Sequence, residues 1–177
     1  MREKIWLTAH TRMVTEARHR RNAKLWDLIV IWYSTAMVIA SVMSLQTTEG
    51  SETSYLLVSL SIGVLAMSIF VPTLGHKVDA DKHRSCYLSL QELLDTADNG
   101  ALSKEYHSIL AEYPNHQDRD WISYLVTSRL GGTKLMSEKG EIEANNWHFL
   151  SFFFYCLFDL IFWIALFFAP VLVFNFL

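Results

Sequence analysis

The sequence predicts an all-α membrane protein with four parts: a basic N-terminal helix, a two-span transmembrane hairpin, a cytoplasmic helical domain and a third hydrophobic helix at the C-terminus. Of the 177 residues, 51% are hydrophobic and only 19% are charged. Ten of the eleven Phe residues lie between Phe149 and Phe176, a clustering that no soluble core requires. No segment shows the alternation of apolar and polar residues that marks a half-buried strand.

The first predicted element is a basic cytoplasmic helix over residues 1–27. Seven of the fifteen Lys and Arg residues lie in the first 24 positions, and neither Gly nor Pro interrupts them. Four apolar residues recur at roughly helical spacing and predict the packed face of this helix: Ile5, Trp6, Met13 and Ala17. Arg12, Arg18 and Lys24 lie elsewhere on the helix. The run from Arg18 to Arg21 either fixes membrane topology or binds anionic lipid or another polyanion. We expect the helix to continue directly into the membrane.

Three apolar stretches are long enough to be membrane spans, because about 20 helical residues cross about 30 Å of hydrocarbon. The first two, residues 28–45 and 55–75, are joined by a short loop and predict an antiparallel hairpin over residues 28–75. The third, residues 147–177, exceeds the length of a simple span. It either tilts or begins as an interfacial segment.

Charge asymmetry predicts the orientation of the spans. Lys and Arg precede the first span and follow the second, whereas the loop Gln46–Ser54 contains two Glu and neither Lys nor Arg. Cytoplasmic loops carry an excess of Lys and Arg. We therefore expect the N-terminus and residues 76–146 in the cytoplasm, and the C-terminus on the other side.

Residues 76–146 show helical periodicity. In the first helix one stripe comprises His83, Tyr87, Leu90 and Leu94, and Asp98-Asn99-Gly100 predicts its end. A second helix over 103–113 ends at Pro114. A third, over 118–130, turns inward Trp121, Tyr124 and Leu125. Residues 133–146 are polar and predict a short helix or a hinge.

Asp159 is the only charged residue in the third apolar stretch. A carboxylate within a bilayer costs a few kcal/mol and faces protein or water. Three interpretations of Asp159 stay open. The carboxylate lines or gates a pore, forms a hydrogen bond that docks the third span on another helix, or marks the membrane interface, so that only Leu160–Leu177 crosses.

Small residues recur every four positions in the hairpin. They predict close helix packing at Ala36, Ala40 and Ser44 in the first span and at Ser59 and Gly63 in the second. Serine pairs spaced by seven are candidates for lining a pore between several copies: Ser34 with Ser41, and Ser61 with Ser68. Alternatively, each hydroxyl bonds back to its own helix.

Motifs of catalysis and cofactor binding are missing from the sequence. It contains no Walker loop, GxGxxG, HExxH or GxSxG pattern and only two Cys. We therefore expect no enzyme, cofactor, metal or sequence-specific nucleic acid. His76 and His83 lie near Asp79 but lack further ligands for a metal. An intramembrane enzyme would rest only on Asp159 and the scattered His residues.

One stretch of the chain resembles a known family. After the hairpin come Cys86-Tyr87-x-x-Leu90 and the segment Tyr106–Asp118, which reads YHSILAEYPNHQD. Over about residues 1–130, this order is similar to the SLATT family, small SMODS- and SLOG-associating effectors of bacterial conflict systems with two transmembrane spans. The C-terminal span lies beyond that two-span pattern.

The resemblance implies an antiviral effector of the bacterial inner membrane that oligomerises and breaches the membrane after a sensor signals infection. It implies three kinds of partner: membrane lipid, further copies of the chain, and a sensor protein or nucleotide second messenger. An alternative is a non-conducting anchor or adaptor that recruits a partner through its cytoplasmic helices.

Five residues are candidates for a ligand or partner surface: Tyr106, Asn115, His116, Asp118 and Asp120. The simpler interpretation is that Asn115 or Asp118 caps the following helix and that Tyr106 packs in the core.

Overall fold

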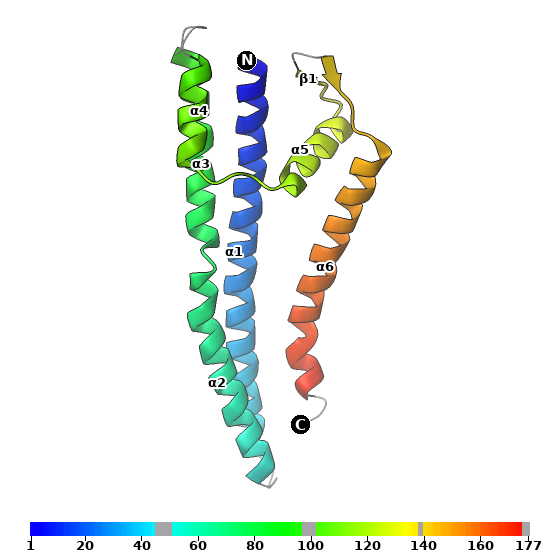
Figure 1. Ribbon diagram of the computed structural model, residues 1–177. Coiled ribbons are helices and arrows are strands. Elements are labelled where there is room, and N and C mark those ends of the chain that lie inside the picture. Colours follow the sequence, from blue (N-terminus) through cyan, green and yellow to red (C-terminus); the bar gives the residue numbers. More distant parts are fainter. Residues whose placement is uncertain (45–50, 97–101, 138–139, 175–177) are drawn as a thin grey trace. The chain divides into compact units, whose positions relative to one another are not determined.

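The structure, a computed structural model, describes residues 1–44, 51–96, 102–137 and 140–174 (Figure 1). These residues form six helices and one two-stranded sheet: α1 (Arg2–Ser44), α2 (Ser51–Thr73), α3 (His76–Thr96), α4 (Leu102–Glu112), α5 (Asp118–Leu130), β1 (Leu135–Ser137), β2 (Gly140–Ile142) and α6 (Asn146–Phe174). The predicted all-α membrane class is confirmed. The predicted stop at Asp98-Asn99-Gly100 and most of the loop between the first two spans lie outside the described residues.

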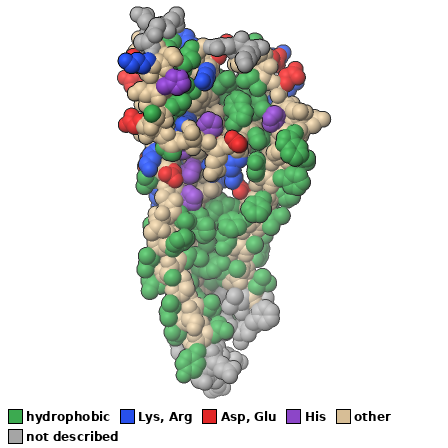
Figure 2. All heavy atoms as spheres, in the orientation of Figure 1, with side chains coloured by type: hydrophobic (Ala, Val, Ile, Leu, Met, Phe, Trp, Pro, Cys, Tyr) green, Lys and Arg blue, Asp and Glu red, His purple; other side chains and the backbone are tan. Residues whose placement is uncertain are grey.

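The chain forms two compact units. Unit 1 comprises Met1–Arg21 and His76–Phe158, and unit 2 comprises Asn22–Gly75 and Asp159–Leu177. Charged side chains gather on unit 1, whereas hydrophobic side chains cover the visible face of unit 2 (Figure 2). Within the stretches Arg2–Ser44, Ser54–Thr96 and Asn146–Leu172, three helices are long and apolar enough to cross a membrane. Unit 2 therefore has the composition of a membrane-spanning bundle.

Helix α1 contributes to both units as one uninterrupted helix, as predicted. Its 43 residues extend about 64 Å at a rise of 1.5 Å per residue, roughly twice the hydrocarbon thickness. At the other junction Gly75 separates α2 from α3 with φ +69°, a left-handed conformation that favours glycine. A side chain at this position would strain the backbone.

Unit 1 has its main core between α1, α3 and α4. The buried side chains are Ile5, Ala9, Cys86, Leu90, Leu93, Leu102 and Tyr106. Tyr87 and Leu94 pack against this core, so the predicted stripe of α3 is confirmed. The helix predicted over 103–113 is α4, and Ile109, Leu110 and Tyr113 lie on its packed side.

A second core cluster joins α5 to the sheet. Tyr124, Leu125 and Leu135 are buried together, with Trp121 and Ile142 packed against them. The prediction of no strand is wrong here, because β1 and β2 pair antiparallel with Leu135 opposite Ile142. Strands of three residues are too short for an alternating pattern to appear in the sequence.

The predicted packed face of α1 is correct only at Ile5. Met13 is 38% exposed and Ala17 is also exposed, whereas Arg12 is fully buried. Thr11 and Thr15 are buried too, and each hydroxyl donates to a carbonyl of its own helix. Elements on several sides cover this half of α1, so a single apolar stripe does not describe its burial.

In unit 2, α6 docks on α1 at the carbonyls that precede Pro170. Proline has no amide hydrogen, so the carbonyl of Leu166, four residues earlier, loses its helical donor. The Tyr33 hydroxyl donates to that carbonyl at 3.0 Å. The Trp32 indole Nε1 donates to the carbonyl of Phe167 at 2.9 Å, and its ring stacks on the Phe167 ring. Helix α1 thus supplies a donor to the one carbonyl, that of Leu166, which Pro170 deprives of its helical partner.

We expect Tyr33→Phe to lower the free energy of unfolding by about 1 kcal/mol, because it leaves the Leu166 carbonyl unpaired in an apolar setting. Pro170→Ala restores an amide donor to that carbonyl, so the cost of Tyr33→Phe should shrink in its background. A double-mutant cycle on detergent-purified protein measures this coupling. Thr35→Val is the control, since its hydroxyl bonds only to α1. Additive effects of Tyr33→Phe and Pro170→Ala would contradict the docking.

Candidate functional site

The four predicted pore-lining serines bond to their own helices. Each hydroxyl donates at 2.8 Å to a backbone carbonyl three or four residues earlier, for Ser34, Ser41, Ser61 and Ser68 alike. This geometry matches the alternative interpretation of these residues. A hydroxyl that donates in this way still has lone pairs to accept a hydrogen bond. Pore lining by these residues therefore stays a prediction.

The small residues of the hairpin differ in burial. Ala36 and Ala40 are buried and Ser44 is half-buried, whereas Ser59 is exposed. Apart from the backbone of its own helix and its chain neighbours, no atom of the described residues lies within 4 Å of the place where a side chain on Gly63 would begin. Gly63 instead borders an apolar cavity of about 200 Å³ between α1, α2 and α6. Of the predicted packing residues, those of α1 are thus closely packed, whereas Ser59 and Gly63 of α2 are not.

Asp159 is half-buried and lies within α6, where it is the first residue that belongs to unit 2. The helix continues through this position without a break. The three interpretations of the carboxylate all remain predictions.

A polar cluster in unit 1 joins α1, α3 and α5, together with the segment that precedes α5. We define it by seven residues: Arg12, Arg18, His19, His76, His83, His116 and Asp120. Its centre is buried, because Arg12, His83 and Asp120 are each at most 3% exposed. Charged groups in such a setting need partners, so their hydrogen bonds decide what the cluster can do.

Arg18 and Asp120 form a bidentate ion pair. Nε of Arg18 donates to Oδ1 at 2.7 Å and Nη2 donates to Oδ2 at 3.0 Å. Asp120 Oδ2 also accepts the backbone amide of Gln117 at 3.3 Å. Gln117 is the N-cap of α5, so the suggestion that Asn115 or Asp118 caps this helix is wrong. The cap follows from Asp120, whose carboxylate reaches back three residues.

Arg12 is held differently. Its Nη1 donates to the carbonyl of Pro114 and to Nδ1 of His83, the latter at 3.2 Å. Its Nε and Nη2 are buried and have no hydrogen-bond partner among the described residues. Burial lowers the pKa of Arg12 from its ordinary value. Since Nδ1 of His83 accepts this bond, the proton of the neutral ring sits on Nε2.

Three histidines continue the cluster along α1 and α3. The rings of His19 and His83 stack with centroids 5.7 Å apart, and Nδ1 of His19 lies 3.4 Å from Nδ1 of His76. Burial, assisted by the neighbouring Arg12, lowers the pKa of His83 from 6.5 to about 4. Burial likewise lowers the pKa of His19 and of His116. The rings of His19, His83 and His116 are therefore favoured in their neutral form near pH 7.

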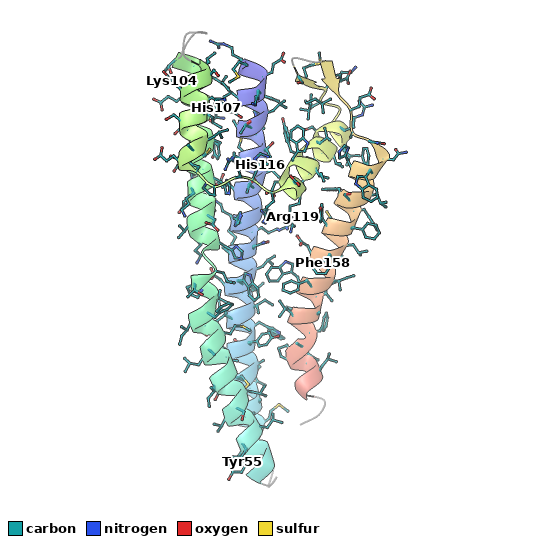
Figure 3. All side chains as sticks on the ribbon, in the orientation of Figure 1. Tyr55, Lys104, His107, His116, Arg119 and Phe158 are labelled. Atoms are coloured by element: carbon teal, nitrogen blue, oxygen red, sulfur yellow. The ribbon has the colours of Figure 1, made fainter. Side chains whose placement is uncertain are left out.

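The five predicted ligand-surface residues do not form one surface. Tyr106 is buried and its hydroxyl lies 3.0 Å from that of Thr8, which ties α4 to α1. Asp120 is buried in its ion pair. Asn115 and Asp118 are exposed, and His116 is half-buried beside α1 (Figure 3). Of the five, His116 alone combines partial exposure with the polar cluster.

Sequence reasoning missed the role of Arg12 and placed Arg18 at a lipid, polyanion or topology surface. The sequence did contain one indication of the polar cluster, since His76 and His83 share one face of a helix. The partner helix that faces them could not be read from spacing. Arg20 is likewise paired, with Glu16 and Asp81.

Among the residues that the structure describes, no group of three or more His, Cys, Asp or Glu side chains is placed to hold a metal ion. The fold and the cluster together define a helical membrane protein with a polar helical unit.

The chain belongs to the SMODS and SLOG-associating 2TM effector domain family 5, whose family model matches residues 1–176. It is thus an effector domain associated with conflict and defence systems. The match extends beyond the resemblance over residues 1–130 and includes α6. Neither the curated proteins nor the solved structures give a match.

We expect Asp120→Asn to lower the free energy of unfolding by about 3 to 5 kcal/mol, because it leaves a largely buried Arg18 without its counter-charge. Chemical unfolding of the detergent-purified protein measures the loss. Asp118→Asn, two residues earlier and exposed, is the control and should cost about 1 kcal/mol or less. Equal effects of the two substitutions would contradict a structural ion pair.

Unfolding should depend on pH through His83. Its pKa of about 4 lies below the ordinary 6.5, so the unfolded state binds more protons between these values. The free energy of unfolding then falls as pH is lowered from 6.5 toward 4. Around His83, Arg12 and His19 act in the same direction as burial, whereas Asp79 and Asp120 oppose it.

His83→Gln keeps an acceptor for Arg12 but does not titrate, so its thermal midpoint should fall less between pH 7 and pH 5 than that of the natural protein. The exposed His107 on α4 serves as control (Figure 3), and His107→Gln should leave the pH profile unchanged. An unaltered slope in His83→Gln would refute the assignment.

Proposed function

We propose that the protein is a pore-forming or membrane-disrupting effector that assembles with further copies of itself in the bacterial inner membrane. The observation that supports this most is the match of almost the whole chain to an effector family, in a chain with three helices suited to cross a membrane. In this proposal unit 1 lies in the cytoplasm with the N-terminus and receives the signal. No catalytic step is involved.

Assembly is favoured by the exposed faces of the hairpin. A single copy has too few spans to enclose a channel, so a pore requires several copies. Ser34, Ser41 and Ser61 are exposed on unit 2, among large apolar side chains such as Val38 and Ile62. Hydroxyls on that face could line a water path between copies, while the apolar side chains contact lipid.

Liposome leakage tests this function. Purified protein should release a trapped dye, and its expression should depolarise cells. The double substitution Ser41→Leu with Ser61→Leu should reduce leakage by about tenfold, since an apolar constriction expels water. Val38→Leu with Ile62→Leu changes only apolar residues of the same helices and is the matched control.

A non-conducting adaptor predicts the opposite pattern. Toxic expression would then leave the membrane potential intact, and the serine variants would retain activity. Substitutions on unit 1 at His116 or Trp121 would abolish activity instead. That combination of results would overturn the pore proposal.

A further inference from the structure

Arg12 has a feature that folding alone does not explain. Its side chain is fully buried on α1, yet two of its three nitrogens, Nε and Nη2, have no hydrogen-bond partner within the described part of the chain. Buried polar groups are nearly always paired, and a charged donor left unpaired destabilises the fold. The unpaired edge of this guanidinium therefore points to a partner from outside the chain.

The two unpaired atoms lie on one edge of a planar group. The Nε and Nη2 hydrogens of arginine point in parallel and match the oxygens of a carboxylate or a phosphate. No carboxylate of the described residues pairs with Arg12, since the nearby Asp120 is occupied by Arg18. An anion with two or more oxygens would satisfy this edge.

His116 adds a second unpaired group. Its Nδ1 is buried without a partner among the residues that the structure describes. Burial and, after it, the charge of nearby Arg12 lower the pKa of the His116 ring. It lies two residues after Pro114, whose carbonyl accepts from Arg12. The segment Tyr113–Gln117 therefore covers Arg12, and Figure 3 shows His116 on this segment beside α1.

We propose that Arg12 and His116 form a binding site for a phosphate group, either inorganic phosphate or the phosphate of a small phosphomonoester. Two oxygens accept from Nε and Nη2 of Arg12, and a third accepts from the His116 ring. A carboxylate has only two oxygens, so one of these three donors would remain without its own acceptor oxygen.

The ligand comes from solution rather than from a lipid headgroup. Arg12 lies sixteen residues before Leu28, where the first apolar stretch begins, and these residues belong to one helix, so they are separated by about 24 Å of helix rise. A headgroup at the membrane surface does not reach that far. The site is thus suited to a soluble phosphate compound that acts on unit 1.

Calorimetric titration of the full-length protein in detergent tests the site with three anions at matched ionic strength: inorganic phosphate, adenosine monophosphate and acetate. Phosphate or adenosine monophosphate should bind saturably and raise the thermal midpoint, and acetate should bind at least about tenfold more weakly. Tighter binding of adenosine monophosphate assigns the site to a phosphomonoester, and equal binding assigns it to the free anion. Neither readout depends on pore formation.

Variants distinguish the contribution of the paired guanidinium donors from that of positive charge alone. Arg12→Lys keeps the charge but loses the paired donors, so it should weaken phosphate binding by about tenfold or more. His116→Phe keeps the ring volume and should weaken binding by a smaller factor, even if Arg12 variants fold poorly. The control is Arg20→Gln on the same helix, where the arginine is 43% exposed and already paired, and binding should be unchanged.

Two results would overturn the site. One is the lack of saturable phosphate or adenosine monophosphate binding by the natural protein up to about 10 mM. The other is an Arg20→Gln effect as large as that of Arg12→Lys, which would show attraction to general positive charge. Tighter binding of acetate than of phosphate would likewise exclude a phosphate site.

Discussion

Arg18 and Asp120 meet inside unit 1 at 2.7 Å, and this ion pair attaches α5 to the polar half of α1. Asp120 also caps α5 through Gln117, so one carboxylate both starts that helix and positions it. A buried carboxylate is tolerable only with such partners. The segment that leads into α5 is then held against α1, and Pro114 and His116 lie on it. The environment of Arg12 depends on that placement.

Unit 2 has the same need for partners to its buried polar groups, but there the groups are backbone carbonyls. Hydrocarbon offers no hydrogen bonds, so each backbone carbonyl within a span must find a protein donor. Pro170 breaks that rule at the Leu166 carbonyl of α6, and the Tyr33 hydroxyl of α1 supplies the missing donor. Trp32 of α1 adds a further hydrogen bond to the next carbonyl, that of Phe167. Helix α1 therefore stabilises both units through polar side chains: in unit 1 through charged groups, and in unit 2 through two aromatic donors.

Local patterns explain which parts of the fold were predictable. Helical stripes and stops depend on neighbouring residues, so α3, α4 and α5 could be placed from the sequence with Pro114 as a boundary. Burial of Arg12 depends on which helices surround it, and no spacing within α1 encodes that. The lost donor at Pro170 is readable in the sequence, but its replacement by Tyr33 lies more than 130 residues away.

The polar cluster contains two arginines that differ in one respect, and the difference suggests where regulation enters. Arg18 has a carboxylate of the chain, that of Asp120, as its partner. Among the described residues, Arg12 donates hydrogen bonds only to neutral groups, a histidine nitrogen and a backbone carbonyl. Its other two nitrogens have no partner there. Arg18 thus meets a carboxylate through two of its nitrogens, whereas the Nε and Nη2 edge of Arg12 has no partner among the described residues. Both arginines lie on α1, the helix that contributes residues to both units.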